Sequence, residues 1–92
     1  MQNKFEDPSK SNPPPYRVTD LYLAAFLRCQ GLLFLTTEKE GRRITFVFEG
    51  REDIEELIRQ YFNNGFVKVQ DFKGALRDFK QIVFEAREGE RP

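Results

Sequence analysis

Residues 32–48, LLFLTTEKEGRRITFVF, hold two apolar stretches separated by a charged segment that contains glycine, and this arrangement decides the fold. The stretches 32–37 and 43–48 are rich in β-branched and aromatic residues, which predicts two β-strands. Gly41 in the intervening segment 38–42 suits a hairpin loop. Ile44, Phe46 and Phe48 alternate with the other residues of the second strand, so we expect these three side chains to face the core.

Three helices are predicted around this hairpin. Residues 20–30 follow Thr19, a hydroxyl N-cap, and stop before Gly31, which suits a left-handed helix end. This first helix is apolar around most of its circumference, so it is either central or covered by a partner. Residues 51–63 repeat apolar side chains at helical spacing. A last helix covers residues 71–87, with Asp71 as its cap, and residues 66–69 are either a short third strand or an extended link.

The predicted order is therefore α-β-β-α-(β)-α. A hairpin has one face to cover and three helices are available, so a two-layer α+β sandwich is the expected fold class, an antiparallel hairpin packed against three helices. We expect one domain over residues 16–88. Residues 1–15 are polar and contain proline, which predicts a disordered N-terminal arm, and residues 89–92 are expected to fray.

Composition excludes several classes of function. The chain has 92 residues with 15 basic and 15 acidic side chains, so its formal net charge is zero and a basic field over the whole molecule is absent. It has no histidine and one cysteine, Cys29, which removes the commonest general base and any cysteine metal site. No segment approaches the roughly 20 apolar residues that span a bilayer. We expect a cytoplasmic, non-enzymatic protein without a metal or another cofactor.

The last helix carries the candidate site. Its apolar face consists of Phe72, Leu76, Phe79, Val83 and Ala86. A basic stripe runs roughly a quarter-turn away, with Phe84 inside it. The candidate binding residues are Lys73, Arg77, Lys80, Phe84 and Arg87.

This stripe is either a solvated flank of the helix or a contact surface for a macromolecule. As a contact surface, its first candidate partner is a protein, and the alternative is a nucleic acid whose bases stack on Phe84 while the cations hold phosphates. Arg42 and Arg43 either extend the stripe or pair with Glu38 and Glu40 across the hairpin, and pairing is the favoured interpretation. The acidic residues in segment 49–56 are explained by the start of a helix, with a metal or acid–base site as the less favoured alternative.

Three segments together resemble a small bacterial and phage domain family that is known only as a domain of unknown function. They are residues 20–25 followed by Gly31, residues 46–48 followed by a helix that ends in residues 61–65, and Phe72, residues 75–77 and Lys80 in the last helix. The resemblance covers about residues 16–87. It implies a shared fold and a prokaryotic, phage or mobile-element setting, and it implies no site residues.

Overall fold

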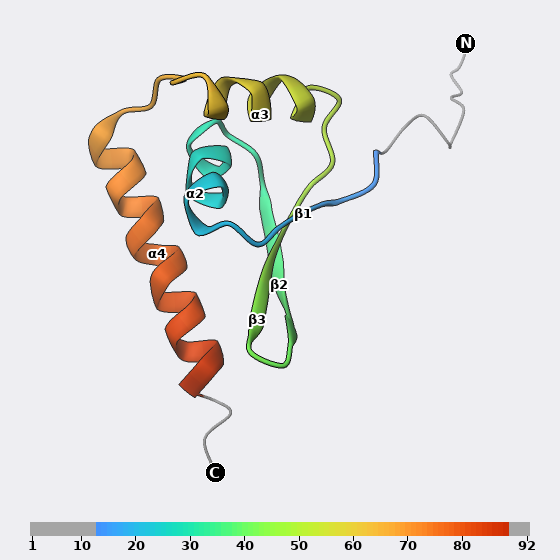
Figure 1. Ribbon diagram of the computed structural model, residues 1–92, viewed down its shortest axis with the longest axis vertical. Helices are drawn as coiled ribbons and strands as arrows, with labels where there is room; N and C mark the ends of the chain where they lie inside the picture. The colour runs from blue at the N-terminus through green and yellow to red at the C-terminus, as the bar shows by residue number, and fades with distance from the viewer. Residues whose placement is uncertain (1–12, 89–92) are drawn as a thin grey trace.

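The computed structural model describes residues 13–88, which form three helices and a three-stranded antiparallel sheet in the order β-α-β-β-α-α (Figure 1). The strands are β1 (Tyr16–Val18), β2 (Phe34–Glu40) and β3 (Arg43–Phe48), and the helices are α2 (Leu21–Cys29), α3 (Ile54–Phe62) and α4 (Val69–Glu88). The predicted α+β class is confirmed. Most of the predicted N-terminal arm, and the predicted frayed tail, lie outside the described residues.

The sheet does have a third strand, but it is β1, which precedes the hairpin in the chain. The strand considered for residues 66–69 is therefore absent from the described structure. Residues 66–68 form a link without a strand, and Val69 already belongs to α4. The sheet order is β1-β3-β2, with Tyr16 opposite Phe48 and Val18 opposite Phe46. β1 has three residues, too few to show the alternation by which a strand is recognised, and only its pairing with β3 defines it.

The hairpin is tighter than the sequence suggested. β2 continues to Glu40, so the predicted loop 38–42 shrinks to the two residues between Glu40 and Arg43. Gly41 is the first of these two residues and has φ +62°. A type II′ hairpin turn requires a positive φ at this position, and glycine adopts it readily. The two strands are therefore paired up to the turn, where Glu40 lies opposite Arg43.

Asp20, rather than the predicted Thr19, caps the first helix. Its carboxylate accepts hydrogen bonds from the backbone N–H groups of Tyr22 at 2.8 Å and Leu23 at 3.3 Å. A carboxylate accepts hydrogen bonds from the free N–H groups as a hydroxyl does. Its negative charge is also stabilised by the positive end of the helix dipole. Gly31 at the other end has φ +89°, which confirms the predicted left-handed residue.

This assignment predicts different costs for two neighbouring substitutions. We expect Asp20→Ala to lower the free energy of unfolding by about 1 kcal/mol, the usual cost of losing an N-cap. Thr19→Ala should change it by less than about 0.5 kcal/mol, as exposed positions outside a cap usually do. Urea denaturation followed by circular dichroism measures both values, and a larger loss for Thr19→Ala would contradict the assignment.

The other two helices also start at positions different from those predicted. α3 begins at Ile54 instead of residue 51, and Asp53 at its N-cap makes no side-chain capping bond. The reason is local, because Arg51 binds both carboxylate oxygens of Asp53, at 3.0 and 2.6 Å. α4 begins at Val69, so Asp71 lies in its first turn and is not its cap.

The core lies between the sheet and helices α2 and α4, which cover the same face of the sheet (Figure 1). Residues 23–27 of α2 are all buried, so the chain itself covers this apolar helix. Ala24 and Ala25 are fully buried, and such small side chains let the neighbouring backbone come close. Phe79 of α4 closes an aromatic cluster, with ring centroids 4.8 Å from Phe46 and 5.1 Å from Phe34.

Candidate functional site

All five predicted binding residues lie on α4, and each is exposed. The contrast between two phenylalanines is the clearest sign of an outward surface: Phe79 is 3% exposed and Phe84 is 58% exposed. At about 100° per residue, five positions turn a helix by roughly 140°, so Phe84 and Phe79 cannot share a face. Phe79 packs α4 against the core, and Phe84 on another face of the same helix therefore projects into solvent.

Four of the predicted residues line one groove on the outward side of α4. We name it the outer groove, and it has a volume of about 650 Å³. The half-buried side chain of Leu76 gives it an apolar centre next to Phe84. Its lining consists of Lys73, Leu76, Arg77, Lys80, Gln81 and Phe84.

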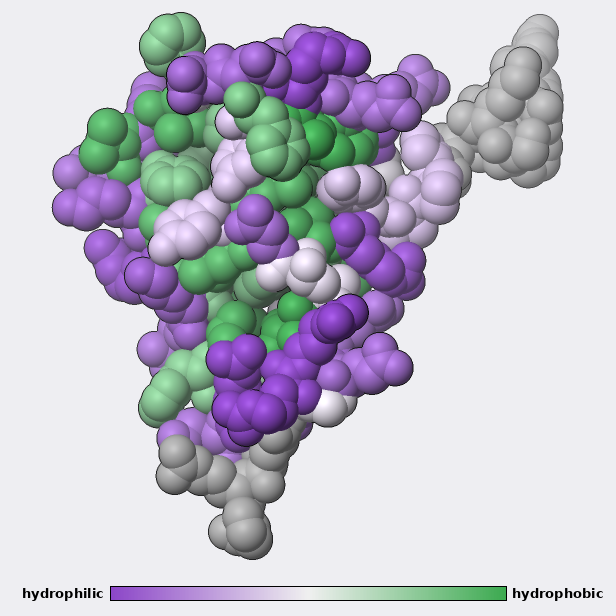
Figure 2. Space-filling view, in the orientation of Figure 1, coloured by the Kyte–Doolittle hydropathy of each residue, from purple (hydrophilic) through white to green (hydrophobic). Residues whose placement is uncertain are grey.

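Arg87 belongs mainly to a second surface, which the sequence did not predict. The C-terminal half of α4 and the tip of the hairpin leave a hollow of about 880 Å³ between them, which we name the hairpin–α4 cleft. Figure 2 shows apolar surface in this region, bordered by hydrophilic side chains. The cleft is lined by Thr19, Leu21, Arg42, Arg43, Ile44, Phe46, Lys80, Val83, Phe84, Arg87 and Glu88.

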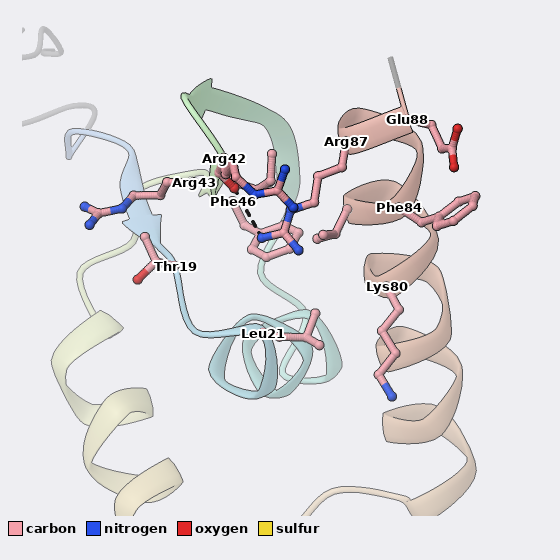
Figure 3. Close-up of a pocket in the computed structure, with 11 residues that line it drawn as sticks. Thr19, Leu21, Arg42, Arg43, Phe46, Lys80, Phe84, Arg87 and Glu88 are labelled. Carbon is pink, nitrogen blue, oxygen red and sulfur yellow. Dashed lines mark hydrogen bonds between the residues drawn. The ribbon is translucent and has the colours of Figure 1, made fainter. Parts of the chain in front are cut away.

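Arg87 reaches across the cleft. Its Nη2 donates a hydrogen bond of 3.2 Å to the backbone carbonyl of Arg42, 45 residues earlier in the chain (Figure 3). Phe84 and Glu88 point away from the hairpin in the same view, and Arg43 extends toward β1. The predicted stripe is therefore divided: Lys80 and Phe84 border both surfaces, while Lys73 and Arg77 face only the outer groove.

The prediction that Arg42 and Arg43 pair with Glu38 is wrong. Glu38 instead binds Arg17, with 3.0 Å between Oε1 and Nε, across the sheet face opposite the helices. The hydrogen bond from Arg17 and its positive charge lower the pKa of Glu38. Within residues 13–88 neither Arg42 nor Arg43 forms an ion pair, so both charges remain available to a ligand.

A third hollow, of about 380 Å³, lies beside Cys29 where α2 meets the start of α4. Burial, and secondly the charge of Asp71, raises the pKa of the Cys29 thiol. A thiol with a raised pKa stays protonated at neutral pH, and the thiolate is the reactive form. This hollow therefore lacks an activated nucleophile.

Three of the five carboxylates in segment 49–56 are engaged with their neighbours. Glu49 accepts a hydrogen bond of 3.0 Å from the backbone N–H of Leu33, Asp53 binds Arg51, and Glu56 binds Arg59. Among residues 13–88 there is no group of three or more His, Cys, Asp or Glu side chains placed to hold a metal ion. In the same part of the chain no helix has the length and apolar character needed to cross a membrane.

The comparisons with known proteins concern the family alone. A search of the curated proteins and a search of the solved structures each found no match. Residues 14–85 match a family that is described as "Domain of unknown function (DUF5659)", and this region includes every strand and helix described above apart from the last three residues of α4. The resemblance inferred from the core positions is confirmed, and the chain belongs to this domain family of unknown function.

Proposed function

We propose that this protein is a small, non-enzymatic, cytoplasmic accessory domain that binds another protein through the outer groove of α4. The observation that carries the proposal is the 58% exposure of Phe84 beside the cations of this groove. Exposed aromatic residues are enriched at protein interfaces, and aromatic and arginine side chains supply much of the binding energy there.

The geometry favours a partner surface that combines negative charge with an apolar side chain. Lys73, Arg77 and Lys80 present three positive charges around Leu76 and Phe84. Within residues 13–88, none of these three cations forms an ion pair. A neutral partner surface would leave these cations without partners, whereas carboxylates beside an apolar group would satisfy both features.

The alternative is a nucleic-acid-binding module that uses the same residues, with a base stacked on Phe84. Two observations disfavour it. The net charge of the chain is zero, and Gln81 in the groove donates a hydrogen bond of 2.8 Å to Glu85, which places a carboxylate at its border. Phosphate contacts would therefore have little support from the surrounding field.

Photocrosslinking tests the proposal. A photoreactive phenylalanine analogue is placed at position 84, and at position 55 of α3 as a control, in the cells that naturally produce the protein. We expect a protein adduct at position 84, reduced roughly tenfold by Arg77→Glu, the usual scale for a central interface residue. Arg28→Glu, which changes an exposed arginine on α2 outside both surfaces, should leave the adduct unchanged.

Three results would contradict a protein partner at the outer groove. The first is equal adducts at positions 84 and 55, and the second is an adduct at position 84 that persists at full yield in Arg77→Glu. The third is an adduct whose added mass is removed by nuclease, which would favour the nucleic-acid alternative.

A further inference from the structure

The hairpin–α4 cleft combines two kinds of chemistry in one hollow. Its interior is apolar, because Ile44 and Phe46 of β3 meet Leu21 of α2 and Val83 of α4 there. Its mouth is cationic, because Arg42 comes from the hairpin turn and Arg87 from the last turn of α4. The elements that supply these residues are distant in sequence, so the arrangement is a property of the folded chain.

The two guanidinium groups retain their capacity to bind an anion. Arg87 spends one N–H on the neutral carbonyl of Arg42, which holds the side chain across the cleft without cancelling its charge. A guanidinium has five N–H donors in a fixed fork, and carboxylates match this fork with paired hydrogen bonds. Two such groups at the mouth of one hollow favour an anion over a neutral ligand.

We infer that the hairpin–α4 cleft binds an acidic segment of a partner protein through one bulky apolar side chain, which enters over Phe46 and Val83, while neighbouring carboxylates bind Arg42 and Arg87. The inference rests on the proposed function, because the segment belongs to the same partner. Lys80 and Phe84 border both surfaces, so one partner can grip the C-terminal half of α4 from both sides.

The charge pattern favours a peptide over a second copy of this chain. The densest acidic stretch of the chain lies around the start of α3, where Asp53 and Glu56 are already bound by Arg51 and Arg59. A nucleic acid fits less well, because the net charge of the chain is zero and gives phosphate contacts little support from the surrounding field. An acidic peptide places its carboxylates singly and fills the apolar interior with a side chain.

Fluorescence anisotropy with labelled synthetic peptides tests the inference on the full chain. The probe is a peptide of about ten residues with one central phenylalanine among aspartates and glutamates. Its two controls replace that phenylalanine with alanine or the acidic residues with lysines. We expect the probe to bind, each control peptide to bind at least about tenfold more weakly, and Arg42→Glu and Arg87→Glu each to weaken the probe by about tenfold.

Arg28→Glu is the matched control variant, because it reverses the charge of an exposed arginine that lines neither the cleft nor the outer groove. It should leave peptide affinity within about twofold, since a cation on α2 outside the cleft is screened at physiological salt. Circular dichroism and the melting temperature are compared for all three variants, and only variants that fold like the parent enter the comparison. Arg42 and Arg87 lie on separate elements, so the two variants probe the cleft from its hairpin side and from its α4 side.

Three outcomes would overturn the inference: no binding of the probe, equal binding of the probe and its alanine control, or unchanged affinity in both cleft variants. Tighter, cleft-dependent binding of a single-stranded oligonucleotide of equal charge would also overturn it, in favour of phosphate recognition. If any of these occurs while the adduct at position 84 still depends on Arg77, the proposed function stands and only the cleft assignment fails. If that adduct is also absent, both fail.

Discussion

Replacing Phe79 with alanine is expected to remove most of the free energy that holds the protein folded. Phe79 is 3% exposed, and its ring lies within 6.1 Å, centroid to centroid, of each of Phe34, Phe46 and Phe48. Truncating a buried phenylalanine costs about 3–5 kcal/mol. A domain of this size has a free energy of unfolding on the order of 5 kcal/mol, so the loss would consume most of it.

Phe84→Ala is the control, because it makes the same change five positions later in the same helix. Phe84 is 58% exposed, so we expect its removal to shift the free energy of unfolding by no more than about 0.5 kcal/mol. Urea denaturation followed by circular dichroism gives both values. Similar losses for the two variants would mean that α4 does not pack on the sheet through Phe79. The same control separates folding from binding, because Phe84→Ala is expected to lose the partner while it keeps the fold.

Gly50→Ala is the second change from which we expect a large effect. A Cβ atom at position 50 would overlap the backbone carbonyl oxygens of Pro13 and Pro14, which pass over this glycine just before β1. Backbone atoms cannot move aside as a flexible side chain can. The chain before β1 must therefore shift, at a cost of about 1–3 kcal/mol, the usual range for an overfilled site. Thermal denaturation measures the loss.

Two controls test whether the overlap at position 50 causes the loss of stability in Gly50→Ala. Gly74→Ala makes the same substitution within α4, where a Cβ atom meets nothing within 4 Å, and it should stabilise the protein by up to about 1 kcal/mol. Gly50→Ala in a chain that lacks residues 1–14 should cost much less than in the full chain, because the overlapping carbonyls are gone. An undiminished cost in the shortened chain would refute the overlap as the cause.

Local periodicity was sufficient to predict most of the secondary structure. The strand at residues 43–48 was predicted with its observed bounds, and Phe79 and Phe84 fall on different faces of α4 as the 3.6-residue repeat requires. Position 16–18 escaped detection because three residues are too short for a pattern. The cap moved from Thr19 to Asp20 because both residue types cap helices, and only the chain path decides which one reaches the free N–H groups.

The candidate site was predictable only where it lies on a single element. Lys73, Arg77, Lys80 and Phe84 share one groove because helical spacing alone brings them together. The cleft depends on the direction in which the hairpin leaves the sheet, since Arg42 and Arg87 are 45 residues apart. No local pattern encodes that direction. The prediction that Arg42 and Arg43 pair with Glu38 and Glu40 was wrong for Glu38 because its real partner, Arg17, comes from the strand that was not predicted.

The place of β1 in the sheet also bears on how the chain folds. The hairpin of β2 and β3 closes through a two-residue turn, so its contacts are local and form early. Tyr16, by contrast, pairs with Phe48, and the chain between them must be ordered before three residues of β1 find their partners. Contacts of long sequence separation bear most of the loop-closure cost and slow folding. β1 precedes β2 and β3 in the chain, yet it is expected to be the last of these three strands to dock, after α2 and the hairpin have built the surface that receives it.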